Sequence, residues 1–206
     1  GVFRRQRQMC IRDRYIMGKI EIIIGCMFSG KTTELIRRVS RYKSINKTNV
    51  IINSNIDTRY DGGVITHSGS ILDCVKTDKL MSIVSTLRNI EVIGVDEAQF
   101  FDDLYTFALW CERNNKILII AGLDGDTNRK PFGDILSCIP ICDSVNKLTA
   151  LDKDGEEAIF TIKKVKSSNR IEIGNNNIYQ AVTRQTFINF HKTTSGLDEY
   201  ECSFEM

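Results

Sequence analysis

The sequence predicts an α/β protein in which a parallel β-sheet has helices on both faces and is followed by a small C-terminal β subdomain. Three observations support this prediction. Short β-branched segments alternate with segments of helical periodicity up to about residue 121, which is typical of parallel sheets. The first such segment ends in a glycine-rich turn of the phosphate-binding type. After residue 148, short apolar runs are separated by polar turns.

The first elements follow from the spacing of apolar residues. Residues 20–24 are isoleucines except for Glu21, and this largely apolar, β-branched run predicts a buried strand ending at Gly25. From Thr32 onward, apolar residues recur at helical spacing among arginines and lysines. The next predicted elements are a strand over 50–52, a loop over 53–70, a strand over 71–75, and a helix over 78–87 capped by Asp78 or Thr77.

The later elements repeat the same alternation. They are strands over 92–95 and 117–121, a helix over 104–111, and two short strands over 160–165 and 170–173 with a turn at 174–177. From Lys192 onward the chain is polar and we expect it to be frayed. The expected organisation is a leader over 1–16, a nucleotide-binding α/β domain over 17–148, a small subdomain over 149–191 and a flexible tail over 192–206.

Charge and composition narrow the function. The formal net charge is +2, but residues 1–16 contain five arginines and one acid. The basic excess therefore lies in this leader, and we expect no nucleic-acid partner for the folded part. We interpret the leader as non-native or disordered, with Met17 as the true start; a transit peptide is the alternative.

Cysteine usage and hydropathy suggest a compartment. The seven cysteines are scattered and form no CxxC pair, which favours reduced thiols and a cytoplasmic location. No run of about 18 apolar residues is present, so we expect no membrane span.

Residues 25–32 (GCMFSGKT) match the complete phosphate-loop pattern G-x-x-x-x-G-K-[ST]. The motif follows a predicted buried strand and opens a predicted helix, which is the context that it requires. We expect the backbone N–H groups and Lys31 to bind the phosphates of ATP, and the Thr32 hydroxyl to ligate Mg²⁺. The loop residues in this expectation are Gly25, Cys26, Met27, Phe28, Ser29, Gly30, Lys31 and Thr32.

Two adjacent acids follow the strand predicted over 92–95. Asp96 at the end of an apolar strand is typical of the second Mg²⁺-binding element of phosphate-loop enzymes. Glu97 lies at the same edge, where a carboxylate can accept a proton from an attacking hydroxyl. A helix N-terminal acidic pair favoured by the dipole is the alternative.

Weaker signals lie in the loops. Arg59 in the 57–60 segment and Arg129 in the 128–132 segment suit phosphate oxygens, although solvated arginines are equally common in loops. Phe100, Phe101 and Phe132 can form an apolar slot for a base, with core packing as the alternative. The two histidines, His67 and His191, lack ligand partners at metal spacing, and we expect neither to be catalytic.

Together these motifs resemble those of the type II thymidine kinase family. Residues 25–35 (GCMFSGKTTEL) resemble the family's GPMFSGKSTEL, and residues 57–60 (DTRY) are similar to its DTRY loop. Residues 96–101 (DEAQFF) are similar to DEGQFF, and 123–125 with 129–132 resemble the LDG and RKPF pair. Residues 147–150 (KLTA) match a run before the family's small domain.

The resemblance implies ATP-dependent phosphorylation of the thymidine 5′-hydroxyl, with Glu97 as general base and Lys31 and Arg59 as further catalytic residues. It implies nucleotide contacts from Asp57, Thr58, Arg59, Asp96, Glu97, Ala98 and Gln99 as well as the phosphate loop. It also implies a lasso-like loop that closes over the nucleoside. The implied nucleoside contacts are Met27, Phe100, Leu123, Thr127, Phe132, Thr161, Ile171, Glu172, Ile173, Gly174 and Tyr179.

Three departures from the family pattern are visible. The stretches 152–155 and 183–186, which match the family's two zinc-binding CxxC pairs, contain no cysteine. We therefore expect no structural zinc, because zinc needs thiolate or imidazole ligands at that spacing. Thr127 matches an aromatic residue of the family, and the lasso is about one residue shorter near Gly174, so an altered nucleoside preference is possible.

Two other function classes are open at this stage. Residues 96–99 (DEAQ) also resemble the acidic motif of motor ATPases of the helicase type, and a non-catalytic ATP-binding regulator is the second alternative. The expected partner is thymidine or a related deoxynucleoside, and the family resemblance implies a homotetramer.

Overall fold

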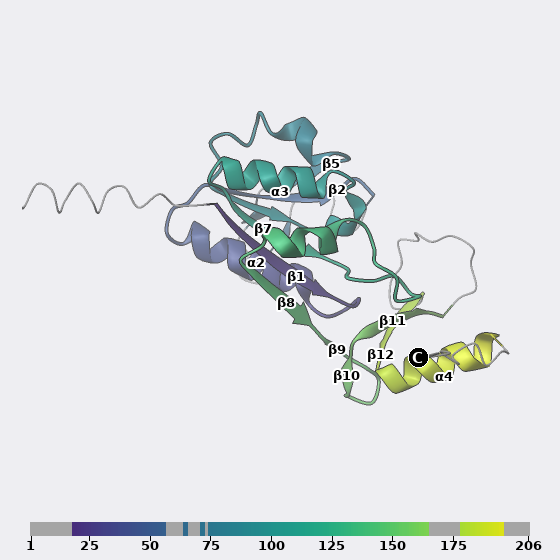
Figure 1. The fold of residues 1–206 in the computed structure, drawn as a ribbon. Coiled ribbons are helices and arrows are strands. Elements are labelled where there is room, and N and C mark those ends of the chain that lie inside the picture. Colours follow the sequence, from purple (N-terminus) through teal and green to yellow (C-terminus); the bar gives the residue numbers. More distant parts are fainter. Residues whose placement is uncertain (1–17, 57–63, 66–70, 73, 165–177, 196–206) are drawn as a thin grey trace, which may run out of the picture.

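The structure, a computed structural model, describes residues 18–56, 64–65, 71–72, 74–164 and 178–195. Its centre is a six-stranded sheet in the order β5-β2-β6-β7-β1-β8, and every strand pairing in it is parallel (Figure 1). This confirms the predicted α/β fold. The strands are β1 (Lys19–Gly25), β2 (Asn49–Ser54), β5 (Cys74–Thr77), β6 (Val92–Val95), β7 (Ile117–Gly122) and β8 (Ser144–Leu148).

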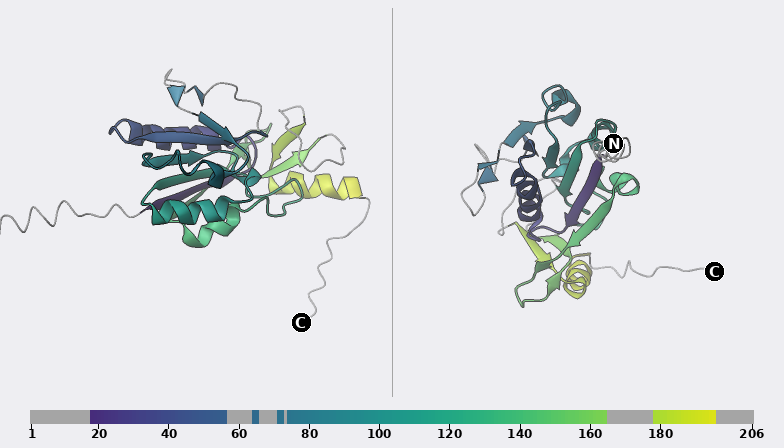
Figure 2. Two further views of the ribbon diagram at one scale, coloured as in Figure 1. Left: turned by 90° about the horizontal axis from the view of Figure 1, so that it is seen from above. Right: turned by 90° about the vertical axis from the view of Figure 1, so that its left-hand side faces the viewer.

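Helices cover both faces of this sheet, as expected (Figure 2). Because side chains alternate along a strand, neighbouring residues enter different cores. Ile51 of β2 packs with Leu35 and Val39 of α2 (Lys31–Lys43). Ile52 packs on the opposite side, with residues of α3 (Leu104–Arg113) and of the 3₁₀ segments η1 (Leu80–Ile83) and η3 (Ile135–Ile141).

A small β subdomain follows β8 at the carboxyl ends of the parallel strands (Figure 1). It contains two antiparallel pairs and a terminal helix. These elements are β9 (Ala150–Leu151), β10 (Glu157–Ala158), β11 (Phe160–Lys163), β12 (Tyr179–Val182) and α4 (Arg184–Ser195). The subdomain contacts the phosphate loop, since the Cys26 thiol donates a hydrogen bond to the Ala158 carbonyl at 3.3 Å.

The helix predicted over 78–87 was wrong, because only η1 forms there. The Ser82 and Thr86 hydroxyls donate to the carbonyls of Lys79 and Ile83 at 2.6 and 2.7 Å, and such local bonds compete with α-helical pairing. The N–H groups of residues 80 and 81 donate instead to the Asp103 carboxylate, at 3.2 and 2.8 Å.

Other boundaries also differ from the predictions. The loop predicted from residue 53 starts later, because β2 continues through the buried Asn53 and Ser54. The strand predicted over 71–75 is two strands: β4 (Ile71–Leu72) pairs with β3 (Val64–Ile65), whereas β5 joins β2.

The C-terminal region holds elements that the sequence did not reveal. Strand β8 was not predicted because it is a mixed, largely polar segment that is mostly exposed at the sheet edge. Helix α4 runs through Ser195, so the frayed chain predicted from Lys192 was wrong for the residues up to 195. The predicted strand over 170–173 and turn over 174–177 lie outside the described residues, and the described partner of β11 is β12. Within the described ranges, no helix is long and apolar enough to cross a membrane.

Candidate active site

At two positions of the phosphate loop between β1 and α2, the backbone has a conformation that favours glycine. Gly25 has φ 150°, and a Cβ there would collide with the Leu148 carbonyl oxygen. Gly30 has φ 79° and precedes α2. Phe28 also has a positive φ, of 66°, which is uncommon outside glycine. This conformation directs the start of α2, with its N–H groups, toward the carboxyl edge of the sheet.

Lys31 lies folded over this loop. Its Nζ donates to the Cys26 carbonyl at 2.6 Å and lies 3.5 Å from the Ser29 hydroxyl, which itself donates to Cys26 at 2.9 Å. Burial lowers the pKa of Lys31, and the negative charges of Glu97 and Asp96 oppose that shift. The ammonium group is therefore close enough to both acids to interact with them electrostatically.

The phosphate loop and the acidic pair meet at the Thr32 side chain. Its hydroxyl donates to the Asp96 carboxylate, at 2.9 Å from Oδ2 and 3.2 Å from Oδ1. Asp96 is buried at the end of β6. Strand β7 lies between β1 and β6, so the two motifs extend from strands on either side of it. The structure thus brings together the two segments that the sequence placed at one edge.

Glu97 is half-buried and has φ 48°, a left-handed conformation that is strained for a glutamate. The Gln99 amide donates to its Oε2 at 2.6 Å. The other end of the same amide accepts the Leu123 N–H at 3.0 Å. Gly122 leaves room for this amide, because a Cβ there would lie 2.6 Å from the Gln99 Oε1. Gln99 therefore connects Glu97 to the loop after β7.

Only part of the predicted base slot has the expected placement. The rings of Phe100 and Phe132 meet edge to face, with centroids 5.8 Å apart. Phe101 is 1% exposed and belongs to the core, so for this residue the core-packing alternative holds. It shares a hydrophobic cluster with Leu104 and Phe107 of α3. Leu123 and Thr127 are half-buried in the loop after β7.

The small subdomain supplies further residues beside the phosphate loop. The buried Thr161 hydroxyl accepts the Met27 N–H at 3.0 Å, which joins β11 to the loop. Tyr179 is buried on β12, opposite Lys163 of β11. Ala98, which directly follows the acidic pair, is fully buried at the start of η2 (Ala98–Phe100).

Several predicted site residues lie outside the described residues. They are Asp57, Thr58, Arg59, Ile171, Glu172, Ile173 and Gly174, and His67 and Tyr60 lie there too.

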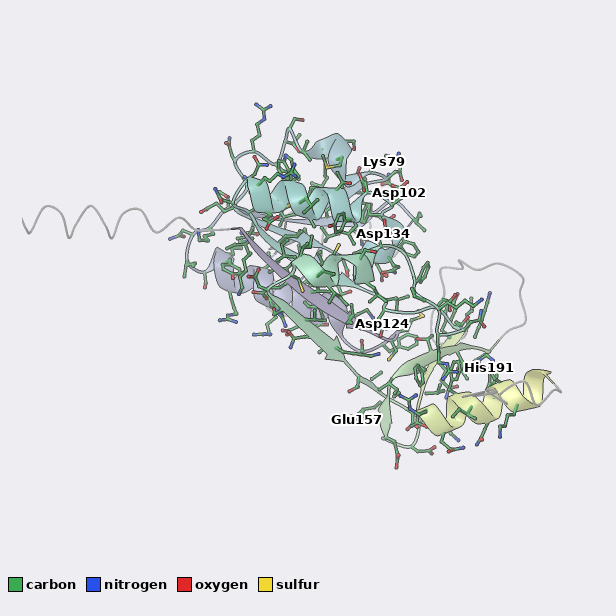
Figure 3. All side chains as sticks on the ribbon, viewed as in Figure 1. Lys79, Asp102, Asp124, Asp134, Glu157 and His191 are labelled. Atoms are coloured by element: carbon green, nitrogen blue, oxygen red, sulfur yellow. The ribbon has the colours of Figure 1, made fainter. Side chains whose placement is uncertain are left out.

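Sequence reasoning missed two contacts near the site. Lys147 of β8 forms an ion pair with Asp124 at 2.6 Å, and Asp124 also contributes to the electrostatic environment of Lys31. The Arg129 guanidinium lies over the rings of Phe160 and Phe187 in the small subdomain. The Phe187 ring in turn contacts that of His191, which is labelled in Figure 3. No local pattern marks either contact, although the spacing of Phe187 and His191 places both on one face of a helix.

A sequence profile described as "Thymidine kinase" matches residues 18–187, which include the phosphate loop, the acidic pair and most of the small subdomain. The chain belongs to the thymidine kinase family. Among its thymidine kinase relatives, the raccoon poxvirus protein is 44% identical over 174 residues, covering 84% of this chain and 98% of the viral protein.

Relatives come from viruses and from a plant. The thymidine kinase of vaccinia virus (strain Western Reserve) is 43% identical over 173 residues, covering 83% of this chain and 97% of the viral protein. That of Oryza sativa subsp. japonica is 42% identical over 180 residues, covering 83% of this chain and 66% of the plant protein. Membership of the thymidine kinase family favours neither the motor ATPase nor the non-catalytic regulator.

Within the part of the chain that the structure describes, no group of three or more His, Cys, Asp or Glu side chains is arranged to hold a metal ion. Thr32 and Asp96 form a smaller set of oxygen donors. Magnesium is bound through one or two carboxylates together with substrate phosphates and water, so a small set of this kind fits Mg²⁺.

Proposed function

We propose that this chain is a nucleoside kinase that transfers the γ-phosphate of ATP to the 5′-hydroxyl of thymidine, with Glu97 as general base. The observation that carries the proposal is the Thr32–Asp96 hydrogen bond, because it joins the phosphate loop to the strand end that bears Glu97. Membership of the thymidine kinase family supports the same reaction.

The triphosphate binds along residues 25–32. Anions are favoured at this position because successive N–H groups and the N-terminus of α2 face them. Lys31 leaves the Cys26 carbonyl and pairs with the phosphates, where its charge offsets the charge that develops during transfer. Arg59 is proposed to assist there, and Asp57 and Thr58 to contact the nucleotide.

Thr32 and Asp96 are the residues that would hold Mg²⁺. Their side-chain oxygens lie within 3.2 Å of one another, and hydroxyl and carboxylate oxygens are the ligands that this ion prefers. When bound, Mg²⁺ supplies positive charge that offsets the negative charge of the phosphates.

Glu97 accepts the proton of the nucleoside 5′-hydroxyl in the proposed reaction. The Gln99 amide fixes the Oε2 atom, and the left-handed backbone at residue 97 sets the direction of the side chain. Base catalysis of this kind contributes about 10²- to 10⁴-fold to a rate.

The nucleoside lies between the main domain and the small subdomain. Phe100 and Phe132 supply apolar ring surface on one side, and Thr161 and Tyr179 are buried on the other. Met27 connects both sides through its N–H contact with Thr161. We further propose backbone contacts to the base from residues 171–174, which would reject an ill-fitting base by leaving buried polar groups unpaired.

The small subdomain is proposed to hold its shape without zinc. At the first stretch that lacks cysteines, the Asp152 carboxylate accepts the N–H groups of Asp154 and Glu156, each at 2.9 Å. At the second, the Thr183 hydroxyl accepts the Thr186 N–H at 3.3 Å. A homotetramer and a cytoplasmic location are proposed from the family resemblance and the cysteine usage.

A phosphoryl-transfer assay tests the function. The chain starting at Met17 would be incubated with radiolabelled ATP, Mg²⁺ and each of the four deoxynucleosides, without added zinc. We expect thymidine to be labelled fastest. Hydrolysis of ATP stimulated by single-stranded DNA, with no labelled nucleoside, would overturn the proposal.

The variant Glu97→Gln tests the role of Glu97. The control is Glu157→Gln, a substitution at an exposed acid that is labelled in Figure 3. We expect Glu97→Gln to lower kcat by about 10²-fold or more while ATP still binds. The control should keep the rate of the unchanged protein. Retained turnover in Glu97→Gln would remove this residue from the role of base.

A further inference from the structure

The loop after β7 is a closed turn that presents Arg129 at its tip. An antiparallel bridge joins Gly125 to Pro131 at its base. Inside it, the Asp126 Oδ1 accepts the N–H groups of Asn128 and Lys130 at 2.8 and 2.9 Å. Arg129 has φ 60°, which this internal bonding maintains. The direction of the Arg129 side chain is therefore set by the turn itself.

The Arg129 guanidinium lies over two rings of the small subdomain. Its Cζ is 4.7 Å from the ring centre of Phe187 in α4 and 5.5 Å from that of Phe160 in β11. Both distances are within the range of cation–π attraction. The two rings are themselves 5.1 Å apart, and Phe187 is 1% exposed, so the guanidinium meets a rigid and largely desolvated surface.

His191 provides a second connection between the same two segments. Its ring lies 4.3 Å from that of Phe187, centre to centre, one turn along α4. It also forms a hydrogen bond with the backbone of Thr127, which belongs to the turn. We name the set Arg129, Phe160, Phe187 and His191 the aromatic clasp.

We propose that the aromatic clasp positions the two walls of the nucleoside pocket relative to one another, with Arg129 as its positioning residue. This inference rests on the proposed function, because it concerns the same pocket. The turn continues directly into Phe132 on one wall, while β11 carries both Phe160 and Thr161 on the other. A shift of the turn against α4 therefore changes the distance across the pocket. The phosphate loop is joined to β11 by the hydrogen bond between the Met27 N–H and the Thr161 hydroxyl. Because Arg129→Met leaves this bond in place, we expect ATP binding to change little.

Arg184 offers a matched control. Its guanidinium also lies over Phe160, at 5.1 Å, but both residues belong to the small subdomain. Removing this contact leaves the turn attached to α4. The pair Arg129→Met and Arg184→Met therefore compares the loss of cation–π contacts across the two segments with the loss of one such contact inside the small subdomain.

Steady-state kinetics tests the proposal. We expect Arg129→Met to raise the KM for thymidine about tenfold. The KM of Arg129→Met for ATP should stay within about twofold of the value for the unchanged protein. In Arg184→Met, the KM for thymidine and the KM for ATP should both stay within the same range. Phe187→Leu should resemble Arg129→Met, and the double variant should be little worse than either, because both single variants already lose the contact between Arg129 and Phe187. Phe187→Tyr, which keeps the ring, should bind thymidine almost normally. Equal rises in both KM values, an unchanged KM for thymidine in Arg129→Met, or effects that multiply in the double variant would overturn the clasp.

Amide hydrogen exchange provides a readout that needs no turnover. Residues 126–130 and the first turns of α4 should exchange faster in Arg129→Met than in Arg184→Met. Equal exchange in the two variants would overturn the clasp even if the protein phosphorylates thymidine. Faster exchange confined to Arg129→Met would support it even if the favoured nucleoside is another one.

Discussion

The Thr32 hydroxyl donates a hydrogen bond to the Asp96 carboxylate, at 2.9 Å from its Oδ2, although 64 positions separate the two residues. Thr32 is the second residue of α2, and Asp96 directly follows β6. The contact therefore defines where the phosphate-binding turn and the acidic strand end meet. Predictions about catalysis follow from this point.

Asp96→Asn should lower kcat about 10²-fold at saturating ATP, because the amide removes the negative charge that is proposed to hold Mg²⁺ while keeping the side-chain shape. Activity titrated against Mg²⁺ would measure the effect, and the midpoint should move to higher concentration. Asp78→Asn, at an exposed position before η1, is the control. An unchanged Mg²⁺ midpoint in Asp96→Asn would contradict the proposed metal role.

Gln99→Leu should lower kcat about tenfold with little change in the KM for ATP, because Glu97 loses the amide that orients its Oε2. The Leu123 N–H loses its acceptor as well, so the loop after β7 loosens. Gln185→Leu, on the exposed side of α4, provides the comparison. If both variants kept the same kcat, Gln99 would have no part in positioning the base.

Gly133→Ala should destabilise the fold by about 3 kcal/mol or more, because φ is 62° and the new Cβ would collide with the Gln99 carbonyl oxygen. Gly155→Ala is matched to it: φ is 81° but no atom lies within 4 Å of the added Cβ, so only about 1–2 kcal/mol of backbone strain remains. Urea unfolding of both variants measures the difference. Equal losses would show that the contact with residue 99 is unimportant.

His191 should make the protein sensitive to mild acid. Burial lowers its pKa from 6.5, the Arg129 charge lowers it further, and the hydrogen bond with Thr127 opposes both. The folded state therefore favours the neutral ring. The contribution of His191 to the free energy of unfolding is fully present above about pH 6.5. It is lost as the pH falls below that value, because the unfolded chain binds the proton first.

Melting temperatures from pH 8 to pH 5 test this sign. Below pH 6.5, the melting temperature of the unchanged protein should fall further than that of His191→Gln. His67 is present in both proteins, so the difference isolates His191. Parallel curves for the two proteins would contradict the prediction.

The local pattern of the sequence predicted the sheet and the two motifs at its edge. Residues 20–24 and 117–121 are buried on both faces of a parallel sheet. The second segment is a continuous apolar run and the first is interrupted only by Glu21, so both are visible without coordinates. The loop over 25–32 is recognisable because its glycines meet a steric demand that acts within a few residues. Strand β8 escaped prediction, since an exposed edge strand carries no such apolar run.

Tertiary structure alone decided which distant residues meet. The link from Glu97 through Gln99 to Leu123, and the attachment of Arg129 to Phe187, join segments that follow different strands. Each depends on the packing of the sheet, which no window of neighbouring residues encodes. The sequence by itself determined the chemistry available at the site, because residue types and local spacing carry that information. The fold decided the distances between those groups, because distances arise only when the strands pair.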